Sequence, residues 1–307
     1  MKYSHLLECV ARTPWAIDPT KAREILALLA FRAAGHRFTA DELLARVEEA
    51  PPATVTKRAS VAMIPLRGII AHRMGTMEES SGGMSAERFT TAVQAAAADD
   101  DIEAILLDVD SPGGTIPGVP EAAEAVFKAR EQKRVAAIAN AWMASAAYWI
   151  ASQATEIVAI PSALEPCIGS IGVFTIHEDL SAALAQEGVK ITMIKAGKHK
   201  ADWNPFEPLP EETRAEIQAA VDGAYDQFVK DVARGRGVTA TAVRRGFGEG
   251  RALTAVDAKA AGLIDRIGTL EETIGRLVGK ASKAAMRAGI VDADEAEDER
   301  HRRFDVI

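Results

Sequence analysis

A serine flanked by alanines, in the string ASAAY (144–148), lies between a β-favouring run and a helix-favouring run. That order predicts that Ser145 stands at a helix N-terminus, where anionic intermediates are stabilised. With a base beside it, such a hydroxyl becomes a nucleophile. A serine in this place is also a common helix N-cap. The residue alone therefore leaves two interpretations, nucleophile and cap.

The chain downstream of this serine carries five candidate bases: His177, His199, Lys195, Lys198 and Lys200. Histidine is the usual partner of a nucleophilic serine. A lysine accepts a proton only where an apolar, water-poor surrounding removes its charge, so a base role demands that Lys200 be buried. The ordinary place for a lysine is a solvated loop. Spacing alone does not choose among the five.

Two glycine-containing strings supply further groups. SPGG (111–114) follows a strand-like run, and glycines without a Cβ allow backbone N–H groups to point at an incoming group. An isolated SPGG is usually an ordinary turn, although open parallel sheets bind ligands at the carboxyl ends of their strands. The second string, GSIGV (169–173), offers the Ser170 hydroxyl as a group that orients an amine. By itself, it too predicts only a turn followed by a strand.

The elements that must position these residues alternate along the chain. Strands are predicted at 61–70, 104–110, 135–140, 156–160 and 189–194, and helices at 86–98, 117–132 and 210–234, the last closed by Gly235. Strands that alternate with helices give an α/β protein with a largely parallel sheet and right-handed crossovers.

Residues 135–155 carry no charge over 21 positions, which is long enough for a membrane helix. The β-favouring start of this run and the interruptions at Asn140 and Ser145 favour a strand, a turn and a buried helix instead. We therefore expect no membrane partner.

Length and composition predict one main core with accessory segments, since the 307 residues are 48% apolar and 5% aromatic. We expect a small helical N-terminal segment at 1–58, a main domain at 59–280 and a charged tail at 281–307. Glu8, Arg12 and Asp18 interrupt the apolar stretch that a signal peptide needs, so the protein is predicted to stay in the cell that makes it.

Charge and cysteine content exclude other classes. The chain has 36 Lys and Arg against 44 Asp and Glu, a net charge of −8, and no basic block, which argues against a nucleic-acid partner. Cys9 and Cys167 lack the spacing of a zinc site or a disulfide framework, as is consistent with a reducing cytoplasm. Nothing calls for a metal or a cofactor.

The order of the strings carries more information than any one of them. Along the chain the order is SPGG, ASAAY, GSIGV, KAGKHK (195–200) and GRALTAVDAKAAGLIDRIG (250–268). This order resembles the signal peptide peptidase A family of serine peptidases over residues 59 to about 275. The family is related in fold to Clp protease and crotonases. PWAIDP (14–19) and the stretch from Val189 to Glu212 are similar to its phage branch, the capsid-assembly or head-maturation proteases.

The resemblance implies a Clp/crotonase-like spiral of β-β-α units that forms a Ser/Lys peptidase domain. It implies that Ser145 is the nucleophile, that Lys200 is the general base and that the Ser170 hydroxyl orients this base. It also implies that the oxyanion accepts hydrogen bonds from backbone N–H groups of Gly113, Gly114 and Ala146. The segment around 164–167 is a few residues longer than in typical members, which bears on the assignment of Ser170.

The function so implied is a serine endopeptidase that processes capsid scaffold, portal or coat subunits in an assembling phage head. Its place would be the host cytoplasm or the procapsid, and family relatives form rings with shared active sites, so a homo-oligomer is expected. Small neighbours of Ser145 predict cleavage after small or modest apolar residues. The alternatives are a bacterial enzyme that degrades residual signal peptides and a mainly structural capsid protein. A crotonase-type acyl-CoA enzyme shares the fold, but the Ser/Lys pairing argues against it.

Overall fold

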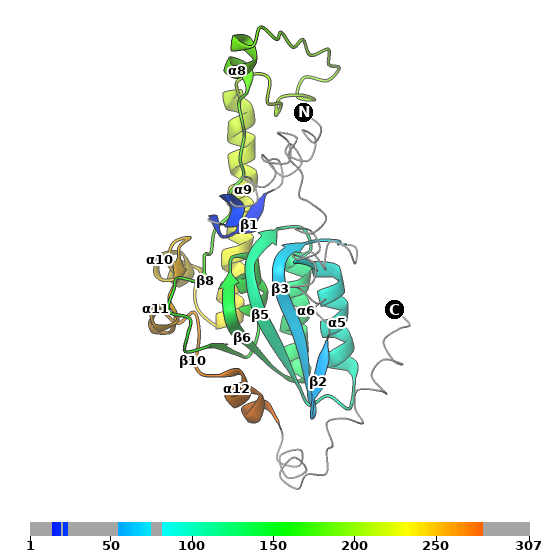
Figure 1. The fold of residues 1–307 in the computed structure, drawn as a ribbon, viewed down its shortest axis with the longest axis vertical. Helices are drawn as coiled ribbons and strands as arrows, with labels where there is room; N and C mark the ends of the chain where they lie inside the picture. The colour runs from blue at the N-terminus through cyan, green and yellow to red at the C-terminus, as the bar shows by residue number, and fades with distance from the viewer. Residues whose placement is uncertain (1–13, 20, 24–54, 75–81, 279–307) are drawn as a thin grey trace, which may run out of the picture.

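The computed structural model describes residues 14–19, 21–23, 55–74 and 82–278 (Figure 1). Most of the predicted helical segment at 1–58 and all of the charged tail at 281–307 lie outside these residues. Where the segment at 1–58 is described, residues 15–17 and 56–58 form strands and not helices. The strands are β1 (Trp15–Ile17), β2 (Thr56–Arg58), β3 (Val61–Ala71), β4 (Gly83–Ser85), β5 (Ala104–Thr115), β6 (Arg134–Ala144), β7 (Glu156–Ala159), β8 (Ile168–Gly169), β9 (Ala252–Leu253) and β10 (Arg266–Ile267). The helices are α5 (Ala86–Ala98), α6 (Val119–Gln132), α7 (Ala146–Ala151), α8 (Ser181–Gln186), α9 (Glu211–Arg236), α10 (Ala240–Gly246), α11 (Ala255–Ala261) and α12 (Leu270–Leu277).

The described strands form one sheet in the order β10-β7-β6-β5-β3-β2. All neighbours in this path are parallel except β2, which runs antiparallel to β3. Helices connect the central parallel strands, as parallel pairing requires. The predicted α/β class with a largely parallel sheet is confirmed, and four of the five predicted strands are present.

Alternation along the strands divides the core between the two faces of the sheet. In β5, Ile105 and Leu107 pack into the larger cluster with α5, α6, α7 and the second half of α9. Ala104 and Leu106 point to the opposite face, where Ile274 and Leu277 of α12 cover them. Because side chains of a strand alternate between faces, the continuous apolar run AILL is buried on both sides.

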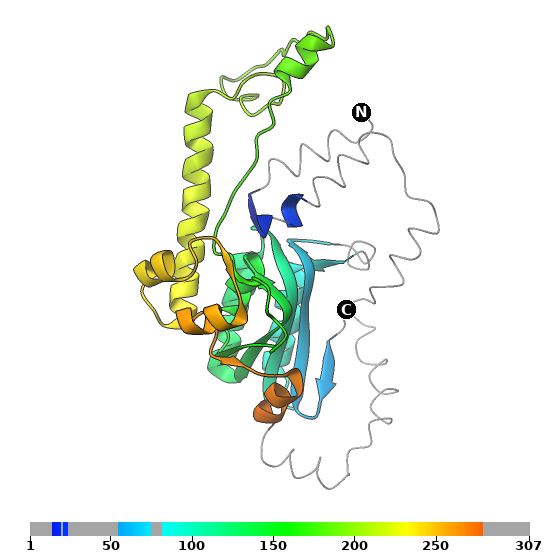
Figure 2. The ribbon, with the colours of Figure 1, turned by 60° about the vertical axis from the view of Figure 1, so that its left-hand side comes forward.

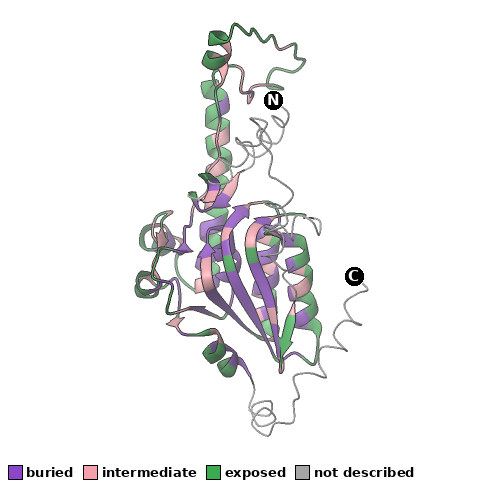
Figure 3. Ribbon diagram, viewed as in Figure 1, coloured by how far each residue is buried: buried purple, intermediate pink, exposed green. Residues whose placement is uncertain are grey.

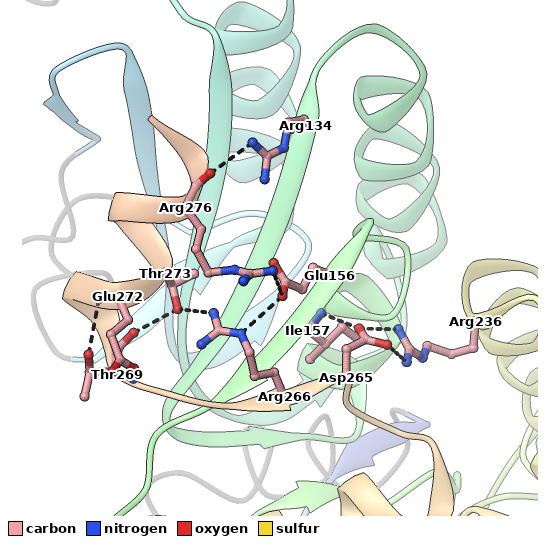
Figure 4. A network of polar contacts seen from close by, with 10 residues as sticks. All are labelled: Arg134, Glu156, Ile157, Arg236, Asp265, Arg266, Thr269, Glu272, Thr273 and Arg276. Atoms are coloured by element: carbon pink, nitrogen blue, oxygen red, sulfur yellow. Dashed lines mark hydrogen bonds and ion pairs between the residues drawn. The ribbon is translucent and has the colours of Figure 1, made fainter. Parts of the chain in front are cut away.

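Polar contacts fasten α12 to the edge of the sheet (Figure 4). The helix begins with a capping box, in which the Thr269 side chain accepts from the Glu272 N–H and Glu272 bonds back to the Thr269 N–H. Glu156 at the start of β7 accepts from Arg266 Nε and from Arg276 Nη2, each at 3.3 Å. These contacts hold α12 where its apolar side chains cover the second face.

The run at 135–155 is a strand, a turn and a short buried helix, as predicted. It forms β6 and α7, which meet at Ser145. Among the described residues, no helix has the length and apolar character needed to cross a membrane.

The long helix α9 ends two residues later than predicted. Gly237 closes it in the left-handed conformation at φ 66°, whereas Gly235 lies buried inside the helix. A Cβ on Gly235 would lie 2.8 Å from the carbonyl carbon of Ser152, so this glycine allows close packing and is not a cap. The prediction that Gly235 ends the helix is therefore wrong.

The first half of α9 extends beyond the sheet and carries α8 near its far end (Figures 1 and 2). We call residues 175–222 the arm. Most of its residues are exposed, in contrast to the second half of α9, where Phe228, Val229 and Val232 are buried (Figure 3).

The predicted strand at 189–194 is wrong: this part of the arm has no strand. Val189, Ile191 and Ile194 are 46%, 42% and 98% exposed. A strand requires the backbone of a partner strand, and the described chain places none beside this segment. The segment therefore has a β-favouring sequence but no strand partner among the described residues.

Candidate active site

Ser145 occupies the sharp turn between β6 and α7. Its backbone has φ 54° and ψ −118°. Ser145 occupies the N-cap position of α7, but its side chain makes no capping hydrogen bond. A positive φ is uncommon for a residue with a Cβ and is held only where neighbours enforce it. Here the Ser145 N–H donates to the Gly169 carbonyl at 2.6 Å, and the Ser145 carbonyl accepts from the Trp149 N–H at 2.9 Å.

The Ser145 hydroxyl is fully buried, and no described residue hydrogen-bonds to its Oγ. A buried polar group without a partner costs about 1–3 kcal/mol. Such a cost is typical of a group retained for chemistry rather than for stability. Strained backbone and an unpartnered hydroxyl at the same residue distinguish Ser145 from an ordinary buried serine.

SPGG lies directly beside this turn, although not as the turn that the string alone favours. These residues continue β5, which runs to Thr115. Gly113 has φ 101°, and a Cβ on it would lie 3.0 Å from the Ser145 Cβ and 2.9 Å from the Ala146 nitrogen. Only glycine therefore allows this close approach of β5 to the serine.

The three predicted oxyanion donors differ in what their N–H groups do. The Gly113 N–H donates to the Ser111 hydroxyl at 3.1 Å and is already satisfied. Ala146 is the first residue of α7, so its N–H belongs to the helix-terminal groups without a partner inside the helix. Gly114 faces β1, with Ala16 as its partner in the register. Because the Gly113 N–H is bonded within its own strand, Gly114 and Ala146 are the candidate pair.

GSIGV also reaches the site. Gly169 pairs with Ala144 across β8 and β6, which places Ser170 next to the turn. Ser170 is buried with φ 52°, and its hydroxyl donates to the Gly250 carbonyl at 3.3 Å. In the single chain, the Ser170 hydroxyl thus contacts a carbonyl and not the amine of Lys200.

Lys200 lies on the arm, in a turn, and is exposed. A role as base demands that Lys200 be buried, and in the single chain this burial is absent. The expectation of a buried Lys200 is therefore wrong for the single chain. The two histidines are engaged on the arm as well: His177 Nε2 contacts the Asn204 carbonyl at 3.0 Å, and His199 Nδ1 contacts Asp202 Oδ2 at 2.7 Å. The hydrogen bond from His199, together with that from Lys195, lowers the pKa of Asp202.

A cysteine near the site is not a competing nucleophile. Burial, reinforced by the carboxylates of Asp110 and Glu165, raises the pKa of the Cys167 thiol to about 11. The thiolate is the reactive form of cysteine, so Cys167 stays neutral and unreactive near pH 7. Among the described residues there is also no cluster of side chains suited to a metal ion.

Sequence reasoning did not place residues 14–18 at the site. β1 pairs with β5 at Gly113–Thr115, and Trp15 also pairs with Phe174. The available signal was a short apolar run between Pro14 and Pro19. That run resembled the phage branch, but three residues are too few for a period-2 pattern.

These features define a strand-to-helix serine site in an α/β protein. The sequence model of peptidase family S49 matches residues 128–283, which are 156 of the 307 residues. The chain belongs to peptidase family S49, and the resemblance stated from the order of its strings is confirmed.

Individual relatives lie in phages and in bacteria. The chain is 33% identical to head-tail preconnector protein GP5 of Enterobacteria phage P21, over 78% of this chain and 50% of that protein. It is 29% identical to capsid assembly protease C of Escherichia phage lambda, over 78% and 57%. It is 30% identical to a putative signal peptide peptidase SppA of Enterococcus faecium, over 76% and 66%. The chain thus spans about half the length of the two phage proteins.

Solved structures with a similar arrangement include a ClpP1 mutant from Listeria monocytogenes. It has a TM-score of 0.40 and 16% identity, and the match covers 68% of this chain and 92% of that one. A second is a mutant of the 1510-N membrane-bound stomatin-specific protease in complex with a substrate peptide. It has a TM-score of 0.39 and 20% identity, with 70% and 77% covered.

Proposed function

We propose that this chain is a serine endopeptidase that processes capsid scaffold, portal or coat subunits during the maturation of a phage head. Membership of family S49 supports the reaction class, and the similarity to two phage proteins supports the setting. The observation that carries the proposal is Ser145, a buried and unpartnered hydroxyl on a strained strand-to-helix turn.

The proposed reaction is acyl transfer to Ser145 followed by hydrolysis. The Ser145 oxygen attacks the scissile carbonyl carbon while the neutral amine of Lys200 takes the hydroxyl proton. The N–H groups of Gly114 and Ala146 stabilise the resulting oxyanion, and loss of one such donor costs about a hundredfold or more in rate. The protonated lysine then gives its proton to the leaving amine. Water next attacks the acyl-enzyme, with the same lysine as base, and releases the acid.

Lys200 performs this role, we propose, in a homo-oligomer. In one chain it is exposed on the arm, which extends beyond the body that holds Ser145 (Figure 2). An arm of this kind can bring its lysine to the serine of a second copy, where contact would exclude water from the amine. The rings with shared active sites that the family resemblance implies favour this arrangement. Its setting would be the host cytoplasm or the procapsid.

Labelling and cleavage by matched variants test the proposal. We expect Ser145→Ala and Lys200→Ala each to abolish cleavage of co-expressed capsid subunits, and Ser145→Ala to abolish labelling by a fluorophosphonate. Lys198→Ala is the control, because Lys198 is an exposed lysine on the same turn but is paired with Glu212. Undiminished activity in both test variants would refute the mechanism.

Mixing the two inactive variants tests whether the site is shared. A mixture of Ser145→Ala and Lys200→Ala chains should regain cleavage, because one chain then supplies the serine and the other the lysine. A mixture that stays inactive would exclude a base from a second copy. Cleavage of apolar signal-peptide fragments, with capsid subunits left intact, would favour the bacterial alternative.

A further inference from the structure

β1 lies between two backbone partners at the site of Ser145. On one side it pairs antiparallel with the end of β5, and the Asp18 N–H donates to the Pro112 carbonyl at 2.8 Å. On the other side the Trp15 N–H donates to the Phe174 carbonyl at 2.9 Å, and the Phe174 N–H donates back at 3.1 Å. An extended peptide recognised by strand addition uses the same kind of backbone pairing.

The register brings one carbonyl of β1 to the candidate oxyanion donors. Asp18 bonds to Pro112, and the Ile116 N–H bonds to the Pro14 carbonyl at 3.4 Å. Along an antiparallel ladder, hydrogen-bonded pairs alternate with non-hydrogen-bonded pairs. Ala16 and Gly114 lie two residues from each of these two bonded pairs, so they also form a hydrogen-bonded pair, and the Gly114 N–H faces the Ala16 carbonyl.

The same carbonyl is near the nucleophile. A Cβ built on Gly113 would contact the Ala16 oxygen, the Ala146 nitrogen and the Ser145 Cβ together. Three groups that surround one point this closely lie close to one another. The Ala16 carbonyl oxygen therefore lies near Ser145 and the Ala146 nitrogen, in the region that the carbonyl of a substrate must enter to be attacked.

β1 also takes part in closing the site. Ala16 and Ile17 are 0% and 2% exposed, and the Ser145 hydroxyl has no exposed surface. Because an incoming peptide would need the same backbone donors on β5, β1 and a substrate strand exclude each other.

We propose that residues 14–18 are an internal ligand that occupies the position of the substrate strand and blocks Ser145 until it leaves. The inference rests on the proposed peptidase function, and it adds a segment that controls access and presents a small residue, Ala16, over the nucleophile. The pairing of β1 with β5 spans only three residues, in contrast to the long central ladder of β3 and β5. A short edge segment opens far more readily than the core of a sheet.

Variants of β1 in the full chain give the first test. Ile17→Asp places a charge at a buried position. Ala16→Pro removes the N–H that faces the Gly114 carbonyl and disturbs the ladder by a second route. Neither residue belongs to the proposed catalytic groups. The control is Val256→Asp, which makes the same apolar-to-acid change at a position that is 64% exposed on α11.

The first measurement is the rate at which a fluorophosphonate labels Ser145. Both β1 variants should label about tenfold faster than wild type, as expected when an internal ligand blocks the site about 90% of the time. The Val256→Asp rate should equal that of wild type. A synthetic peptide of residues 14–19, added in excess, should slow the β1 variants again. Equal rates in wild type and in β1 variants that retain the thermal midpoint of wild type would overturn the inference.

The second measurement does not depend on activity. A fluorescein-labelled peptide of residues 14–19 should bind the Ile17→Asp chain and bind wild type at least about tenfold more weakly, by the same occupancy argument. Absence of binding to both β1 variants would overturn the inference. Preferential binding in chains whose Ser145 never labels would support the internal ligand and refute the peptidase. Labelling that requires Ser145 but is unchanged in the β1 variants would support the peptidase and refute the internal ligand.

Discussion

The same substitution at two glycines of α9 is expected to change stability in opposite directions. Gly223 lies in the exposed half of the helix, and a Cβ there would have no neighbour within 4 Å. Gly235 lies in the buried half, where a Cβ would be 2.8 Å from the Ser152 carbonyl carbon and closer still to its oxygen. Both positions are helical, so the difference between Gly223→Ala and Gly235→Ala isolates packing.

The magnitude follows from two opposing terms. Alanine in place of glycine stabilises a helix interior by about 0.5–1 kcal/mol, which is the full effect expected at Gly223. At Gly235 this gain is opposed by overpacking, which costs about 1–3 kcal/mol in a well-packed core. Ordinary contacts begin at 3.4 Å, so the Ser152 backbone must move by at least 0.6 Å. Taken together, the two terms lower the free energy of unfolding of Gly235→Ala by about 1 kcal/mol, near the middle of the range they allow.

The movement at Gly235 has a direct route to the site. Ser152 follows α7, the helix that Ser145 opens, and Trp149 of α7 stacks on Phe228 of α9 with ring centroids 4.4 Å apart. Urea denaturation gives the free energies of unfolding, and fluorophosphonate labelling reports the site. The packing argument is refuted if Gly235→Ala is as stable as Gly223→Ala.

Two further predictions concern groups beside Ser145. Gly113→Ala should reduce labelling of Ser145 by about a hundredfold, because a displacement of about 1 Å at a reacting group has that effect. Gly172→Ala is the control: its Cβ would have an ordinary 3.6 Å contact, so Ser145 in this variant should label at the rate of wild type. In a Cys9→Ser background, alkylation of Cys167 should become fast only as pH approaches the raised pKa of about 11 instead of the usual 9.0. Because this pKa is raised on folding, the neutral thiol stabilises the fold fully below pH 9 and loses that contribution between pH 9 and about 11. Fast alkylation at pH 8 in folded protein would contradict the assignment.

The parallel strands could be predicted because each carries its own signal. β3, β5 and β6 are apolar over continuous runs, since both of their faces are covered. The segment at 189–194 carries a similar local signal and is not a strand, because pairing depends on a partner that local sequence does not specify. SPGG shows the opposite case, a turn-like sequence that lies in a strand. Its glycines suggest a turn, yet β1 and β3 supply partners on both sides and keep it extended.

The site was predictable in its parts more than in its geometry. The order of the strings led to Ser145, SPGG and GSIGV, and the structure brings these three together. The strained backbone of Ser145 is held by a hydrogen bond to Gly169, which is distant in sequence. No local pattern contains that information. Lys200 was selected by resemblance alone, and its exposure on the arm is a property of the tertiary structure.

Under the proposed mechanism, the covered serine and the exposed lysine set two separate conditions for activity, and their kinetics differ. Release of β1 occurs within one chain, so its rate is independent of protein concentration. Delivery of Lys200 from a second copy is an association, so its extent falls on dilution. An Ile17→Asp chain should therefore exceed wild type at every concentration, yet its activity per chain should still fall as the protein is diluted. Activity per chain that is constant on dilution would place the base within the same chain, whatever the state of β1.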